Sequence, residues 1–100
     1  MNTIIQNEND NIVVLLQGRL DTAAAVKTEQ EFKPLYECEG HDITLDCSQL
    51  QYISSSGLRI FLGLLKAASL KKSKVYISGL NQDLKKVLDI TGFTSLFEMK

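Results

Sequence analysis

The stretch LDCSQLQYISSSGLRIFLGLLKAA, residues 45–68, decides the fold. Its first residues belong to a segment, 42–50, in which apolar and polar side chains alternate, and a period of two predicts a strand covered on one face. Its last residues have apolar side chains at the i, i+3, i+4, i+7 spacing of a helix packed on a core: Leu58, Phe61, Leu62 and Leu65. The stretch therefore predicts a strand, a loop rich in serine and a helix, in that order.

Two strands are predicted before this stretch. Residues 12–18, IVVLLQG, are rich in β-branched side chains and apolar on both faces, which is typical of an interior strand. A shorter first strand is expected around Ile4 and Ile5, and the polar residues 9–11 indicate a turn between the two.

A first helix is predicted over residues 23–37, capped by Asp21 or Thr22. Five side chains are expected to form much of its apolar side: Ala24, Ala25, Val26, Phe32 and Leu35. Pro34 should kink or shorten this helix, because proline lacks the N–H that a helix interior needs.

Three further elements are predicted after the long second helix. Residues 75–80 indicate a strand ending in a glycine turn, and 94–99 a last edge strand. Between them, Asn81 should cap a helix that Gly92 ends. The side chains expected to face inward from this helix are Leu84, Val87 and Leu88.

The predicted order of elements is β-β-α-β-α-β-α-β. Strands that alternate with helices indicate the α/β class, with one mixed sheet and helices packed against it. One hundred residues suffice for one such domain and are too few for two. We therefore expect one complete domain spanning residues 1–100.

Composition argues against several functional classes. The net charge of −1 provides no field that would attract nucleic acid or an anionic membrane, and the apolar runs are too short to span one. The basic cluster of Lys71, Lys72 and Lys74 is interpreted as a solvated helix end. No basic segment leads into a long apolar run at the N-terminus, so a cytoplasmic protein is expected.

The cysteines and the histidine do not indicate a metal site. Cys38 and Cys47 lack the CxxC spacing of a zinc site, and His41 is the single histidine. Two isolated cysteines are typical of buried thiols in a reducing compartment.

Four roles are conceivable for the serines at 54–56. A nucleophile is disfavoured, because the G-x-S-x-G pattern is absent and His41, the only candidate base, lies in a polar turn. A phosphate-binding loop is disfavoured by the missing glycines and lysine. Helix capping needs only one serine, and the polar composition of a loop is an alternative explanation for the other two. Phosphorylation remains, because a helix N-terminus tolerates negative charge and its free N–H groups bind phosphate oxygens. We therefore expect no catalytic residue.

The second helix also has residues outside the Leu58 face. Ile60 and Leu64 are expected to lie off that face, with Gly63 between them. Glycine costs about 1 kcal/mol relative to alanine inside a helix, so close approach of another backbone, within the domain or from a partner, would explain Gly63. Arg59 is either solvated or paired with a carboxylate of a partner.

Residues 45–68 resemble the central motif of STAS domains (sulfate transporter and anti-sigma factor antagonist), and in particular the free-standing bacterial anti-sigma factor antagonists. The family's strand end, L-D-x-S, is matched by Leu45, Asp46 and Ser48. The start of the family's second helix is matched by Ser55, Ser56, Gly57 and Leu58. Weaker matches are Gly18, Leu20 and Asp21 in a G-x-L-D pattern, and residues 81–93.

The resemblance implies a regulatory binding module. In the family the serine before the glycine is the phosphoacceptor, which is Ser56 here, with Ser55 as the second choice. The unphosphorylated antagonist binds an anti-sigma factor that is also a serine kinase, phosphorylation weakens the complex, and a serine phosphatase resets it. ATP belongs to the kinase, so no cofactor is expected for this chain.

The residues expected to bind the partner are Asp21, Thr22, Ser54, Ser55, Ser56, Gly57, Leu58, Arg59, Ile60 and Gly63. Many family members have Asp at the position of Ser54, so a negative charge beside the acceptor is missing here. This departure leaves a second hypothesis open, in which the chain is an unphosphorylated STAS scaffold of a transport or sensory complex.

Overall fold

A five-stranded sheet with the order β1-β2-β3-β4-β5 organises the chain in the computed structural model, which describes residues 1–8, 11–37, 41–95 and 97–99. Its strands are β1 (Asn2–Glu8), β2 (Asn11–Leu20), β3 (Asp42–Ile53), β4 (Val75–Ser78) and β5 (Glu98–Met99). β1 is antiparallel to β2, and each later pair is parallel. Residues 9 and 10 of the predicted turn lie outside the described residues, and Asn11 begins β2.

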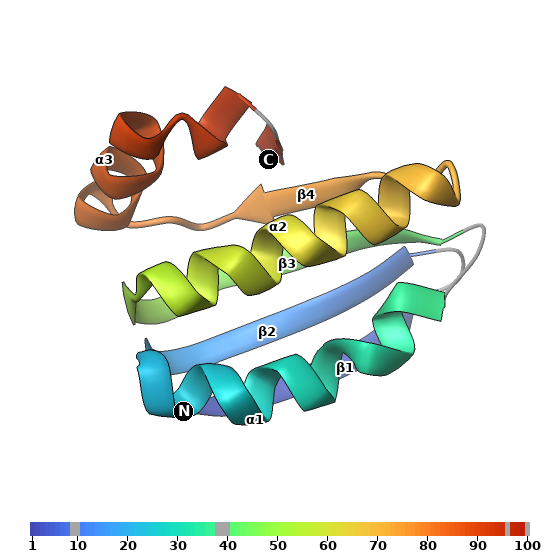
Figure 1. The fold of residues 1–100 in the computed structure, drawn as a ribbon, viewed down its shortest axis with the longest axis horizontal. Coiled ribbons are helices and arrows are strands. Elements are labelled where there is room, and N and C mark those ends of the chain that lie inside the picture. The colour runs from blue at the N-terminus through green and yellow to red at the C-terminus, as the bar shows by residue number, and fades with distance from the viewer. Residues whose placement is uncertain (9–10, 38–40, 96, 100) are drawn as a thin grey trace.

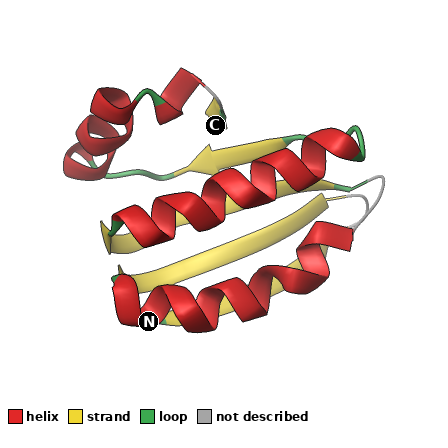
Figure 2. Ribbon diagram, in the orientation of Figure 1, coloured by secondary structure: helices red, strands yellow, loops and turns green. Residues whose placement is uncertain are grey.

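Helices connect the parallel strands. They are α1 (Thr22–Phe32), α2 (Ser55–Leu70) and α3 (Gln82–Thr91), with 3₁₀ turns η1 (Lys33–Glu37) and η2 (Phe93–Ser95). Right-handed crossovers from β2 to β3 and from β3 to β4 step across the sheet in one direction, which places their helices on one face. Figures 1 and 2 show α1 and α2 side by side across that face, and α3 beyond the end of β4. The predicted α/β fold and element order are confirmed.

The core lies between this face of the sheet and the two long helices. Alternate residues of β2, β3 and β4 are in register and buried, because a strand presents every second side chain to one face. The strand side chains in this layer are Ile12, Val14, Leu16, Ile43, Leu45, Cys47, Val75 and Ile77. Phe32 of α1 and Phe61 and Leu64 of α2 are fully buried above them, and the Phe61 ring meets Phe97 edge-on with 6.5 Å between centroids.

The buried face of α2 differs from the predicted one. Ile60 and Leu64 are 6% and 0% exposed, so the prediction that they lie off the packed face is wrong. Leu62 and Leu65, predicted to be packed, are only half-buried. The reason is that α2 has α1 as a neighbour on one flank, which covers Ile60, whereas Leu62 and Leu65 line an open apolar hollow on the other flank.

Two valines were also predicted to face inward and do not. Val26 of α1 is 64% exposed and Val87 of α3 is 39% exposed. The other apolar residues of these helices behave as predicted, with Ala25, Phe32, Leu84 and Leu88 buried. Each helix buries a stripe narrower than its run of apolar residues.

The predicted helix ends are largely confirmed. Asn81 Oδ1 accepts a hydrogen bond of 2.8 Å from the Leu84 N–H, and Gly92 ends α3 with a left-handed φ of 80°. α1 ends at Phe32, and the chain passes through Pro34 in a 3₁₀ turn, as a proline at this place requires.

Two strand predictions need correction. The last strand covers only Glu98–Met99, since residues 93–95 form a 3₁₀ turn. Strand β3 runs on to Ile53, and Thr44, expected on its exposed face, is buried.

The features expected from composition are placed as follows. Lys72 and Lys74 are exposed just after α2, as expected for a solvated helix end. Within the described ranges no helix is long and apolar enough to cross a membrane. The same part of the chain contains no group of three or more His, Cys, Asp or Glu side chains suited to a metal ion.

Of the two cysteines, Cys47 is a free, buried thiol, and Cys38 lies outside the described residues.

Adjacent leucines test the packed face of α2. Leu64→Ala should lower the free energy of unfolding by about 2–5 kcal/mol, because it leaves a cavity in the core. Leu65→Ala should cost less than about half as much, because this side chain is partly solvated. Urea unfolding measures both, and equal losses would contradict the assignment.

Cys47 should make stability depend on pH. Burial, and secondarily Asp46, raises the pKa of its thiol from 9.0 to about 12. Between these values the unfolded thiol ionises and the folded one does not, so the thiol's contribution to stability is full below pH 9.0 and is lost towards about 12. The difference in unfolding free energy between wild type and Cys47→Ala should narrow over this range; a constant difference would refute the assignment.

Candidate functional site

The predicted site residues gather at one edge of the sheet, where β2 and β3 end together. The parallel register pairs Leu20 with Ile53, and the Ser54 N–H donates a 2.8 Å hydrogen bond to the Leu20 carbonyl. α1 begins directly after β2 and α2 directly after β3. The N-termini of both helices therefore lie at the same edge, and both present unsatisfied backbone N–H groups there.

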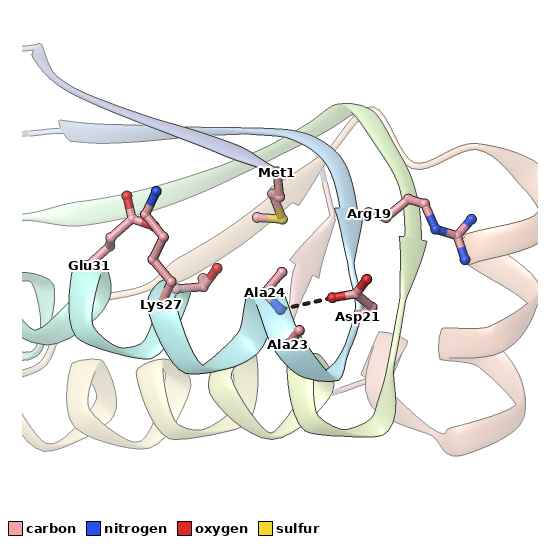
Figure 3. A pocket seen from close by; sticks show the side chains of 8 residues that line it. Met1, Arg19, Asp21, Ala23, Ala24, Lys27 and Glu31 are labelled. Carbon is pink, nitrogen blue, oxygen red and sulfur yellow. Dashed lines mark hydrogen bonds between the residues drawn. The ribbon is translucent and has the colours of Figure 1, made fainter.

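Asp21 caps α1. Its Oδ1 accepts a hydrogen bond of 2.8 Å from the Ala24 N–H (Figure 3), and Thr22 follows as the exposed first residue of the helix. The sequence left open whether Asp21 or Thr22 is the cap, and the structure shows that it is Asp21.

Ser54, and not Ser55, caps α2. Its Oγ accepts a 3.1 Å hydrogen bond from the Gly57 N–H, and the side chain is 8% exposed. The sequence left open which of the three serines is the cap, and the structure assigns it to Ser54 because strand β3 continues to Ile53 and puts Ser54 at the boundary. Ser54 thus makes with a neutral hydroxyl the bond that an aspartate would make with a charged carboxylate.

Ser55 and Ser56 form the first turn of α2. Ser55 is exposed and Ser56 is half-buried. The Gly57 N–H donates to the Ser54 Oγ and the Leu58 N–H to the Ser54 carbonyl. The N–H groups of Ser55 and Ser56 come too early in the helix to have a carbonyl acceptor within it. Within the part of the chain that the structure describes, the Ser56 hydroxyl and the N–H groups of Ser55 and Ser56 have no hydrogen-bond partner, and they lie at the positive end of the helix dipole.

Besides the buried cap Ser54, three residues predicted to bind a partner are instead buried within the domain. Gly57 fits tightly, since a Cβ there would lie 2.7 Å from Leu20 Cγ and 2.9 Å from Ile53 Cγ1. Leu58 and Ile60 are 7% and 6% exposed and belong to the core. These side chains hold α2 on the strands and leave contact with a partner to their neighbours.

A groove of about 430 Å³ between the two helices, called here the α1–α2 groove, joins most of the remaining candidates. Its lining residues are Thr22, Ala25, Val26, Glu29, Tyr36, Ser56, Arg59, Ile60 and Gly63. Of the predicted site residues, Thr22, Ser56, Arg59 and Gly63 meet here with some exposure.

Sequence reasoning missed the residues that complete this groove: Val26, Glu29 and Tyr36. Burial, and secondarily the charge of Glu29, raises the pKa of the Tyr36 hydroxyl, which keeps it a neutral hydrogen-bond donor. Only the packing of α1 against α2 brings these residues opposite Ser56, and no local pattern in the sequence signals it.

Arg19 and Tyr52 were also missed. They are paired across β2 and β3 next to the site, and the guanidinium carbon of Arg19 lies 4.5 Å from the centre of the Tyr52 ring. Figure 3 shows a second hollow on the other flank of α1, beside Met1, Lys27 and Glu31. None of the three serines lines that hollow.

The L-D-x-S motif has a structural role in β3. Asp46 Oδ1 accepts hydrogen bonds from the Ser48 N–H at 3.0 Å and from the Ser48 hydroxyl at 2.6 Å. Gly79, with φ of 74°, packs on this turn, and a Cβ there would lie 2.8 Å from Ser48 Cβ. The motif shapes the strand before the site and is separate from the serines of α2.

His41 is not placed to activate a serine. It precedes β3 at Asp42, whereas Ser54 follows that strand at Ile53, so the whole strand separates them. A general base must lie within hydrogen-bond reach of its nucleophile, and this histidine does not.

Comparison with known proteins identifies the family of this chain. The family model of the STAS domain matches residues 3–100. The chain belongs to the STAS domain family. Its resemblance to that family, first seen in residues 45–68, is thereby confirmed over nearly the whole chain.

Curated relatives of this STAS domain include anti-sigma-B factor antagonists. That of Bacillus subtilis is 30% identical over 94 residues, which cover 94% of this chain and 84% of the relative. That of Listeria monocytogenes is 27% identical over 97 residues, covering 97% and 85%.

Solved structures share the fold. An anti-sigma factor antagonist from Mycobacterium paratuberculosis has a TM-score of 0.87 at 17% identity, with 98% of this chain and 83% of that chain covered. The Bacillus protein SpoIIAA in its phosphorylated form has a TM-score of 0.76 at 16% identity, with 99% and 91% covered.

Adjacent serines test the cap. Ser54→Ala should lower the free energy of unfolding by about 1–2 kcal/mol, because the Gly57 N–H loses its acceptor in a buried place. Ser55→Ala should change it by less than about 0.5 kcal/mol, because Ser55 is exposed. Thermal or urea unfolding measures both; a larger loss for Ser55→Ala would return the cap to Ser55.

Proposed function

We propose that this STAS domain is an anti-sigma factor antagonist that binds an anti-sigma factor with serine kinase activity and is released from it by phosphorylation of Ser56. The observation that supports this most strongly is the position of the Ser56 hydroxyl, at the N-terminus of α2 beside two free backbone donors. The domain acts as a binding module in the cytoplasm, and ATP is supplied by the kinase.

The site is electrostatically suited to a phosphoryl group. A phosphoserine adds about −1.5 to −2 charges, and the positive end of a helix dipole stabilises negative charge within the first turn. Neither the first turn of α2 nor its cap contains an acidic residue. The phosphorylated helix end is therefore as compatible with the fold as the free one.

The same charge would act against a bound partner. A protein docked over the first turn of α2 would meet a bulky dianion where it had met a hydroxyl, and it would have to desolvate that charge. The partner therefore dissociates while the antagonist stays folded, and a serine phosphatase restores the binding form.

The relatives support the same assignment. The anti-sigma-B factor antagonists match almost all of this chain, and a related fold has been solved in a phosphorylated form. Ser54 in place of an aspartate keeps the capping bond to the Gly57 N–H, so this departure from the family leaves the start of α2 intact.

Phosphorylation can be tested directly. The purified chain should be incubated with ATP and each anti-sigma factor kinase encoded by the same genome, and the products mapped by mass spectrometry. One kinase should modify Ser56, Ser55→Ala should remain a substrate, and Ser56→Ala should not. Modification at another residue only would refute the Ser56 assignment, and no modification by any of them would favour the scaffold role.

Binding gives an independent check of the switch. Ser56→Ala should bind the anti-sigma factor about as tightly as wild type, whereas Ser56→Asp should bind at least about tenfold more weakly, a difference of about 1.4 kcal/mol. Both variants should unfold like wild type, because Ser56 makes no capping bond and an acidic residue suits this turn. Equal affinity of the two would contradict the switch.

A further inference from the structure

Gly63 lies in the middle of α2 without a packing reason inside the domain. Among the described residues, a Cβ built on it would meet only the Tyr36 hydroxyl, at 3.5 Å, which is an ordinary contact. The same construction at Gly57 gives contacts of 2.7 to 2.9 Å, so that glycine is required by the fold. Gly63 instead costs about 1 kcal/mol of helix stability relative to alanine, and the packing of α1 on α2 does not require it.

Because Gly63 has no side chain, the α1–α2 groove is deeper at this position. Gly63 lines the groove together with the buried side chains of Ala25 and Ile60 and with Val26, an apolar residue that is 64% exposed. An exposed valine beside the open space over Gly63, in a groove lined by both polar and apolar residues, can contact an apolar side chain of a partner.

The walls of the groove have opposite charges. Arg59 stands on the α2 side and Glu29 on the α1 side, both exposed, and among the described residues no ion pair joins them. Ser56, one turn before Arg59 on the same helix, also lines the groove. A partner seated here would thus touch the serine and the cation together.

We propose that the α1–α2 groove receives an apolar side chain of the anti-sigma factor over Gly63, with a neighbouring carboxylate of that protein paired to Arg59. This rests on the proposed function and names the part of the surface that performs it. A phosphoryl group on Ser56 lies on the same wall as Arg59 and competes with the partner's carboxylate for the guanidinium. Phosphorylation would then occupy Arg59, which the partner's carboxylate had paired with, as well as add negative charge.

The groove floor is tested by side chains added to α2. Gly63→Leu should fill the groove and weaken binding of the kinase identified by the phosphorylation assay at least tenfold, about 1.4 kcal/mol. Gly63→Ala should weaken it less while leaving thermal stability unchanged or raised, so loss of affinity cannot come from unfolding. The matched control is Ser69→Leu, an exposed position on the other flank of α2, which should bind like wild type.

The opposite wall provides a second test. Val26→Asp places a charge in the groove at an exposed position of α1 and should weaken binding, whereas Ala23→Asp, on the other flank of α1, should not. Arg59→Ala should weaken binding and reduce its dependence on salt concentration, because a charge pair with the partner is lost.

The outcomes separate this inference from the proposed function. If wild type binds and is phosphorylated while Gly63→Leu and Val26→Asp bind equally well, the groove is not the docking site and the antagonist function stands. If wild type binds none of the anti-sigma factors of its genome, both fail. Loss of affinity in the two groove variants, with both controls intact, supports the groove.

Discussion

The parallel pairing of β2 with β3 is the constraint on which the site depends. With Leu20 opposite Ile53 and the Ser54 N–H bound to the Leu20 carbonyl, both strands end at the same level. The helix that follows each strand must then begin at the same edge, and right-handed crossovers lay both helices on one face. The serine turn, its N–H donors and the groove between the helices all result from this one pairing.

Features that depend on a few neighbouring residues could be predicted from the sequence. The asparagine before α3 and the glycine after it are such cases, because capping is decided within one helical turn. Alternation in β3 likewise revealed Ile43, Leu45 and Cys47 as core residues. The choice of Ser56 among three serines had a different origin, since it came from the resemblance to STAS domains and not from composition.

What could not be predicted depends on distant parts of the chain. Whether Leu64 or Leu65 is buried depends on which flank of α2 has α1 beside it, and a hydrophobic period alone does not contain that information. Which of the three serines caps α2 could not be predicted, because Ser54 is positioned by a hydrogen bond to Leu20, a residue 34 positions away. The groove joins Glu29 and Tyr36 to Ser56 through tertiary packing alone.

The tight fit of Gly57 has a consequence for the speed of regulation. A Cβ at this position would clash with the side chains of Leu20 and Ile53, so the first turn of α2 packs too closely on the strands to shift without disturbing the core. In the proposed switch, a phosphoryl group on Ser56 would therefore change the surface of the domain and leave the packing beneath it unchanged. Interconversion of the two proposed forms would then need no refolding of the domain, and its speed would be that of adding and removing the group.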